Sequence, residues 1–180
     1  KPRLVRSDAG PGAGGLARAA RRDGRLMGFM NSERATSHAV WRLVRKLGIS
    51  DRVSLIADAE ARREPLFHLD VLAIAEPSGR LRSITLDAMA RGVSVVSALD
   101  PALSLCVPDV TARVVAKPDP TAWEDALIAA ASAASDAPIL ASAQEWVRSH
   151  RSASNHVASV IRAYESVIAA AHGTPSSHAA

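Results

Sequence analysis

The sequence predicts an α/β protein built on a doubly wound parallel sheet, with further helices at its C-terminal end. Short apolar runs alternate with segments whose apolar residues recur at helical spacing. The apolar runs lack the alternation of half-exposed strands, as expected for parallel strands that are buried on both faces. Beyond residue 120 only helical patterns follow. A chain of 180 residues suits one domain with a full hydrophobic core.

The N-terminal segment differs in composition from the rest. Residues 1–24 are rich in Gly, Arg and Ala, and we expect a leader or the remnant of a truncated N-terminal part, with a short helix at 16–22. The domain itself is expected over residues 25–171. Its predicted strands are the apolar runs at 25–30, 53–57, 71–75, 93–97 and 112–116. Its predicted helices before residue 120 lie at 35–47, 58–68 and 83–91.

Glycines and apolar spacing define the remaining helices. Gly48 and Gly92 are expected to end the helices that precede them. The C-terminal helices are predicted at 121–134, 138–149 and 153–171, and the last one places an apolar stripe on one side. Residues 172–180 offer little to pack, so we expect a disordered tail.

Composition narrows the class of partner. Only three Trp, one Tyr and two Phe occur among 48% hydrophobic residues, so little aromatic surface is available to stack on bases. The 22 basic residues are dispersed among 18 acidic ones, which argues against a nucleic-acid partner despite the net charge of +4. The single cysteine, Cys106, lies in an apolar run and is expected to be a buried thiol. It excludes an internal disulfide and a multi-cysteine metal cluster, and we expect a reducing, cytoplasmic location.

A glycine-rich segment matches a known loop pattern. Gly10, Gly12 and Gly15 satisfy the G-x-G-x-x-G spacing of dinucleotide-binding loops. Such a loop follows directly on a buried strand, whereas residues 1–9 make a poor strand. We therefore favour a leader and keep a dinucleotide-binding module as a third interpretation.

The candidate ligand site is the turn between the predicted strands at 71–75 and 93–97. Ligands of open parallel sheets lie beyond the carboxyl ends of the strands, and this turn opens a helix whose free N–H groups would face an anion. The turn carries the polar and small residues Ser78, Gly79, Arg80, Arg82, Ser83 and Thr85. Asp87 lies about one turn into the helix, where its carboxylate can accept hydrogen bonds from a ribose diol. A phosphate-bearing ligand is favoured over an ordinary turn with solvated arginines.

The motifs around this turn resemble those of group 1 glycosyl transferases, the retaining family with two Rossmann-like domains. Residues 85–96 read TLDAMARGVSVV and resemble the signature LEAMA-x-G-x-PVV. Residues 47–53 resemble LGL-x-DRV, and residues 69–71 with Pro77-Ser78 resemble ADV…PS. Residues 114–120 are similar to the strand exit G-x-LV-x-P-x-D. The motifs stand in consistent order over about residues 25–170.

The resemblance implies the Rossmann-like, donor-binding half of a two-domain enzyme. The family moves a sugar from a nucleoside-diphosphate sugar to an acceptor with retention, and needs neither a metal nor another cofactor in this scheme. An E-x7-E pair frames its turn, with the first Glu on sugar hydroxyls, the second on the ribose, and amides between them on the diphosphate. Asp87 falls on the second position. The donor-binding residues implied by the resemblance are Ser78, Gly79, Arg80, Leu81, Arg82, Ser83, Ile84 and Asp87.

Departures from the family pattern keep a second interpretation open. Gly79 occupies the first carboxylate position, so the usual sugar contact is absent unless Glu76 reaches in. Arg82 stands where the family has a small residue, and the acceptor-binding domain that precedes this one in the family is missing. A degenerate transferase domain that serves as a non-catalytic interaction module is the alternative. We expect a nucleotide-sugar donor and the missing N-terminal acceptor domain as partners, with peripheral membrane association through that domain left open.

Overall fold

The computed structural model describes residues 3–6, 11–31, 37–56, 64–77, 79, 83–117 and 119–172. The strands are β1 (Arg3–Arg6), β2 (Leu26–Asn31), β3 (Val53–Ile56), β4 (Val71–Ile74), β5 (Ser94–Ala98) and β6 (Arg113–Val115). The helices are α1 (Pro11–Arg22), α2 (Ser37–Leu47), α3 (Ser83–Ala90), α4 (Pro120–Ala130), α5 (Ala133–His150) and α6 (Ala153–His172). A single 3₁₀ turn over Glu64–Phe67 is all that the described residues show of the helix expected at 58–68. The tail expected to be disordered lies, after His172, outside the described residues.

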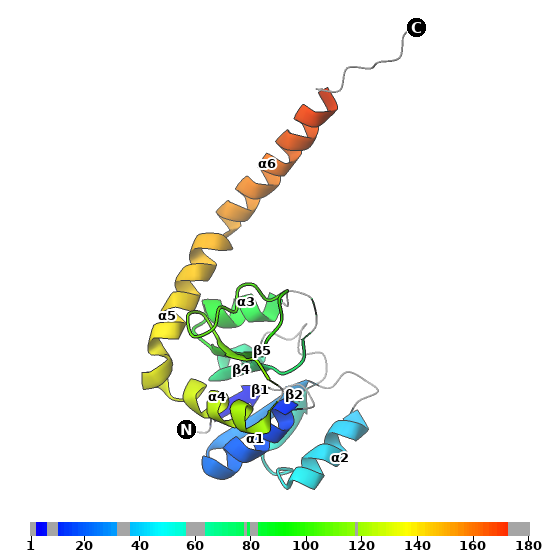
Figure 1. Ribbon diagram of the computed structural model, residues 1–180, viewed down its shortest axis with the longest axis vertical. Coiled ribbons are helices and arrows are strands. Elements are labelled where there is room, and N and C mark those ends of the chain that lie inside the picture. Colours follow the sequence, from blue (N-terminus) through cyan, green and yellow to red (C-terminus); the bar gives the residue numbers. More distant parts are fainter. Residues whose placement is uncertain are drawn as a thin grey trace.

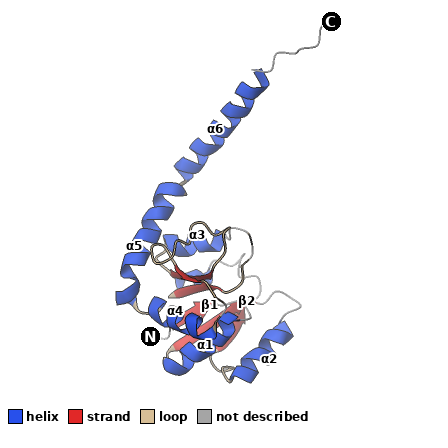
Figure 2. Cartoon of the chain, in the orientation of Figure 1, coloured by secondary structure: helices blue, strands red, loops and turns tan. Residues whose placement is uncertain are grey.

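The strands form one parallel sheet in the order β3-β2-β1-β4-β5-β6. This is the doubly wound order, in which the direction of winding reverses between β1 and β4. Figure 2 shows the strands between two layers of helices. The predicted fold class is confirmed, and the ligand crevice of such a sheet lies beyond the carboxyl ends of β1 and β4.

The prediction of a leader over residues 1–24 is wrong, because β1 and α1 belong to the domain. β1 lies at the centre of the sheet and pairs with β2 on one side and with β4 on the other. Only two apolar residues, Leu4 and Val5, mark this strand in the sequence. Main-chain hydrogen bonds to both neighbours fix its place, and such bonds leave no trace in the pattern of apolar residues.

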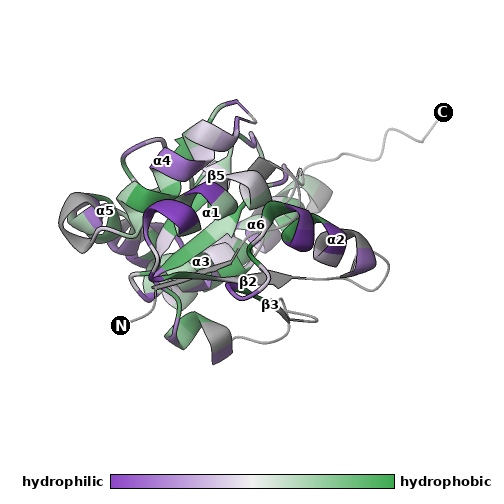
Figure 3. Cartoon of the chain, turned by 90° about the horizontal axis from the view of Figure 1, so that it is seen from below, coloured by the Kyte–Doolittle hydropathy of each residue, from purple (hydrophilic) through white to green (hydrophobic). Residues whose placement is uncertain are grey.

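Two apolar clusters cover the two faces of the sheet. β4 and the next residue send Val71, Ala73 and Ala75 into the cluster with α1, α2 and α4. Leu72 and Ile74 of β4 enter the cluster with α3 and α5. Both sets are buried, as the continuous apolar run had predicted. In Figure 3 the strands at the centre are largely hydrophobic (green), whereas α2 carries hydrophilic stretches (purple).

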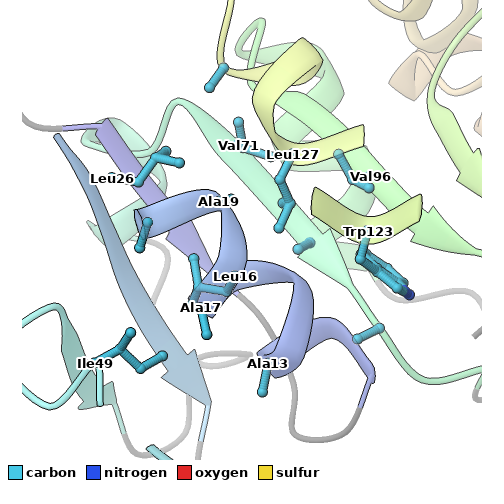
Figure 4. Close-up of a cluster of buried hydrophobic side chains, with 14 of the residues drawn as sticks. Ala13, Leu16, Ala17, Ala19, Leu26, Ile49, Val71, Val96, Trp123 and Leu127 are labelled. Atoms are coloured by element: carbon cyan, nitrogen blue, oxygen red, sulfur yellow. The ribbon is translucent and has the colours of Figure 1, made fainter. Parts of the chain in front are cut away.

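The glycines of α1 serve helix packing. A Cβ atom on Gly15 would lie 2.2 Å from the Cβ of Trp123 in α4 and 3.1 Å from its carbonyl carbon. Trp123 is fully buried together with Leu16 and Leu127, and the close-up in Figure 4 shows these side chains between α1, α4 and the strands. Close approach of the two helices therefore requires the absence of a side chain at position 15. β1 ends at Arg6 and α1 begins at Pro11, so a strand does precede the glycine-rich segment, contrary to the expectation from residues 1–9. The contact with Trp123 gives Gly15 a packing role, and the dinucleotide-binding module stays the third interpretation.

The C-terminal helix extends away from the sheet (Figure 1). Its apolar stripe has nothing packed on it in the described part of the chain, and the side chains on that stripe are 39% to 67% exposed. The stripe consists of Val157, Val160, Ile161, Tyr164, Val167 and Ile168. The spacing repeats every seven residues, which is typical of a helix that packs against another element. No helix in the described ranges has both the length and the apolar character needed to cross a membrane.

We expect Gly15→Ala to lower the free energy of unfolding by about 1–3 kcal/mol, because the added methyl group overpacks the helix contact. The matched control is Gly14→Ala, whose Cβ would lie 3.4 Å from the side chain of Pro120, an ordinary contact. Alanine is also the better helix former by about 1 kcal/mol, so the control should be neutral or stabilising. Urea unfolding measures both variants. Equal stability of the two would contradict the packing role of Gly15.

Candidate functional site

The predicted turn begins where β4 reaches the carboxyl edge of the sheet. Ala75 is buried, and the chain then emerges at Glu76 and Pro77, which are both exposed. α3 starts at Ser83 and leads back toward the opposite edge. The turn thus lies at the crevice where the winding of the sheet reverses, with the N-terminal end of α3 beside it.

Four of the eight predicted site residues fall within the described structure. Gly79 and Ser83 are exposed, and Asp87 is half-buried in the second turn of α3. Ile84 is 3% exposed, and its side chain belongs to the apolar cluster under α3. A ligand at this position can therefore meet only its main chain. The other four, Ser78, Arg80, Leu81 and Arg82, lie outside the described residues.

Asp100, which the sequence analysis did not select, holds this turn from the neighbouring strand. It follows β5 at the same edge of the sheet and is only 7% exposed. Its Oδ2 accepts a hydrogen bond from the Gly79 N–H at 3.0 Å, and its Oδ1 accepts one from the Ala102 N–H at 2.9 Å. The sequence did offer a signal for Asp100, because an acidic residue shortly after a buried strand lies at the edge of the sheet where the carboxyl ends of parallel strands meet.

Gly79 takes a backbone conformation that suits glycine. Its φ is +63°, in the left-handed region that other residues adopt at a cost. A Cβ atom there would have no heavy atom within 4 Å. The absence of a side chain at position 79 is therefore set by backbone conformation, since space is available.

An apolar pocket of about 230 Å³ opens at this edge of the sheet. Ala75 and Pro77 form its wall after β4, and Ala98 and Leu99 form the wall after β5. The remaining lining residues come from β6 and α4: Val115, Ala116 and Trp123. A second pocket of similar size lies at the opposite, amino edge, between Gly24, Gly48 and Arg52. Only the first adjoins the predicted turn.

Cys106, which was expected to be buried, is a partly buried free thiol. Burial raises its pKa to about 11, and the negative charge of Asp100 adds to the rise. The hydroxyl of Ser97 opposes the rise, although Ser97 Oγ forms no well-aligned hydrogen bond. The thiol is therefore protonated near neutral pH and is a poor nucleophile. Among the described residues, no group of three His, Cys, Asp or Glu side chains is placed to hold a metal ion.

Comparison of the structure with solved structures identifies the fold. Its match to the C-terminal domain of the group 1 glycosyl transferase LpcC from Francisella tularensis covers 83% of this chain and 85% of that one, with a TM-score of 0.63 and 16% identity. This chain has the fold of that domain. Neither a family model nor a curated protein matches it in sequence.

Longer proteins contain the same domain fold. HepE of Anabaena, solved with UDP and glucose, matches over 92% of this chain with a TM-score of 0.72 and 15% identity. Sucrose-phosphate synthase of Thermosynechococcus elongatus matches over 94% with a TM-score of 0.75 and 19% identity. The chain spans 48% of the first protein and 46% of the second, or about half of each.

Alkylation of Cys106 should reveal the charge of Asp100. Because the pKa is about 11, the reaction rate with iodoacetamide should keep rising with pH well past the ordinary thiol value of 9.0. Asp100→Asn removes the neighbouring negative charge and should shift this profile to lower pH. The urea-unfolded chain, which lacks both effects, is the control. If the alkylation rate of Asp100→Asn has the same pH dependence as that of the wild type, Asp100 does not act as a negative charge beside the thiol.

Proposed function

We propose that this chain is the donor-binding half of a retaining glycosyltransferase, and that it binds a nucleoside-diphosphate sugar in the cytoplasm. The observation that carries the proposal is the position of Asp87. It lies in the second turn of a helix whose N-terminal end faces the crevice between β1 and β4. A diphosphate at that end and a ribose over Asp87 fit one continuous ligand. Proteins that share the fold include one solved with UDP and glucose.

In the proposed reaction the site must stabilise the departing diphosphate. The N-terminal end of α3, at Ser83, carries the positive end of the helix dipole and main-chain N–H groups that suit an anion. On the sequence alone, we assign Arg80 and Arg82 to the same phosphates, for which guanidinium groups are well suited. Charge stabilisation of this kind is a large component of catalysis in group transfer.

We assign the acceptor to a second domain, which would pack on the stripe of α6. The stripe is apolar and exposed over the length of the helix, and proteins of this fold are about twice as long as this chain. A cleft between two domains would then enclose the donor on both sides. We assign peripheral association with the membrane to that second domain.

A non-catalytic interaction domain is the second candidate. The observation that favours it is Gly79 at the position where the resemblance implies a carboxylate on the sugar. Joining the chain to an acceptor domain separates the two candidates. Sugar transfer or donor hydrolysis by the joined protein would exclude the second candidate, and nucleotide binding without turnover would favour it.

Calorimetry with UDP, GDP and ADP tests the donor site. We expect one of the three to bind, and Asp87→Ala to weaken its affinity at least about tenfold, because a charged acceptor for the ribose hydroxyls is lost. The matched control is Asp51→Ala, an exposed acid at the amino edge of the sheet. It should leave the affinity unchanged. Absence of heat with all three nucleotides, on protein shown by circular dichroism to be folded, would overturn the proposed function.

A further inference from the structure

The turn after β4 has glycine where the resemblance implies a carboxylate, and its main chain contacts the carboxylate of a different residue, Asp100. The resemblance implies a glutamate at position 79, and this chain has glycine there. The carboxylate of Asp100 lies against the main chain of the same residue, with Oδ2 at 3.0 Å from the Gly79 nitrogen. The two residues are far apart in sequence and belong to the exits of neighbouring strands, β4 and β5.

The geometry points to Asp100 as a positioning residue for the donor, an inference that rests on the function proposed above. Both carboxylate oxygens accept main-chain N–H groups, one from each strand exit. The side chain therefore has a fixed orientation and joins the two exits directly. A hydrogen bond to an ionised acceptor is stronger than a neutral one, and low exposure strengthens it further.

This tie determines how the walls of the pocket face each other. Ala75 and Pro77 form one wall, and Ala98 and Leu99 form the other. The Asp100–Gly79 hydrogen bond connects the two chain segments that carry these walls. It also holds Gly79, whose φ is +63°, beside the exit of β5 before any ligand arrives. Preorganised N–H donors bind an anion without a cost of ordering.

The same contact explains why glycine is compatible with a working site. A carboxylate at 79 would have to be attached to a residue in the left-handed conformation. With Asp100 in place, the turn is anchored from the neighbouring strand and needs no side chain at that position.

The test compares Asp100→Asn with Asp119→Asn in the full chain, using UDP as the probe. An asparagine at 100 can offer its oxygen to one of the two N–H groups, and its amide nitrogen then faces the other. Asp119 is the matched control because its carboxylate also accepts a main-chain N–H after a strand, from Ala122 at 3.1 Å, but at the start of α4. Circular dichroism establishes that both variants fold.

Two readouts separate the outcomes. We expect Asp100→Asn to move the amide proton resonance of Gly79 upfield and to weaken UDP binding about tenfold, as the loss of a charged hydrogen bond predicts. The control should change neither. Unchanged UDP affinity in Asp100→Asn, with wild-type binding intact, would overturn the positioning role and leave the proposed function standing. Absence of UDP binding by the wild type would overturn both, whereas an unmoved Gly79 resonance would overturn the tie itself.

Discussion

The close contact of α1 with α4 at Gly15 and Trp123 is the constraint on which the rest of the fold depends. β1 lies in the middle of the sheet, so the face above it must be covered without a gap. α1 covers it from the β2 side and α4 from the β5 and β6 side, and the two helices meet where Gly15 has no side chain. A larger residue would separate them and expose the centre of the core.

The two edges of the parallel sheet have different polar arrangements. At the amino edge, the buried carboxylate of Asp136 in α5 binds Arg113 Nε at 2.8 Å and accepts a hydrogen bond from Ser94. This group joins α5 to the starts of β5 and β6 and is satisfied within the protein. At the carboxyl edge, Asp100 orders the exits of β4 and β5, while the N-terminal end of α3 faces outward. The second arrangement is the one at which we propose that the donor binds.

Much of the fold could be predicted, because strands such as β4 are buried on both faces and carry uninterrupted apolar runs. Gly48 and Gly92 likewise marked the ends of α2 and α3. β1 was missed because it is held in the sheet by main-chain hydrogen bonds to β2 and β4, which the sequence does not show. The packing role of Gly15 in α1 was missed because its partner, Trp123, is more than a hundred residues away in the sequence. The position of Asp87 on α3 followed from helix spacing, whereas the contact of Asp100 with the turn required knowledge of which strand lies beside β4.

The most direct test of the central claim is a titration of the ¹⁵N-labelled chain with UDP, followed by amide chemical shifts. The account predicts that the shifts change at the carboxyl edge, at Gly79, Ser83 and Leu99, where the turn and its pocket lie. The pocket of equal volume at the amino edge, lined by Gly24, Gly48 and Arg52, serves as the internal reference and should be unaffected. Changes confined to the amino edge, or none at saturating UDP, would contradict a donor site at the carboxyl ends of the strands.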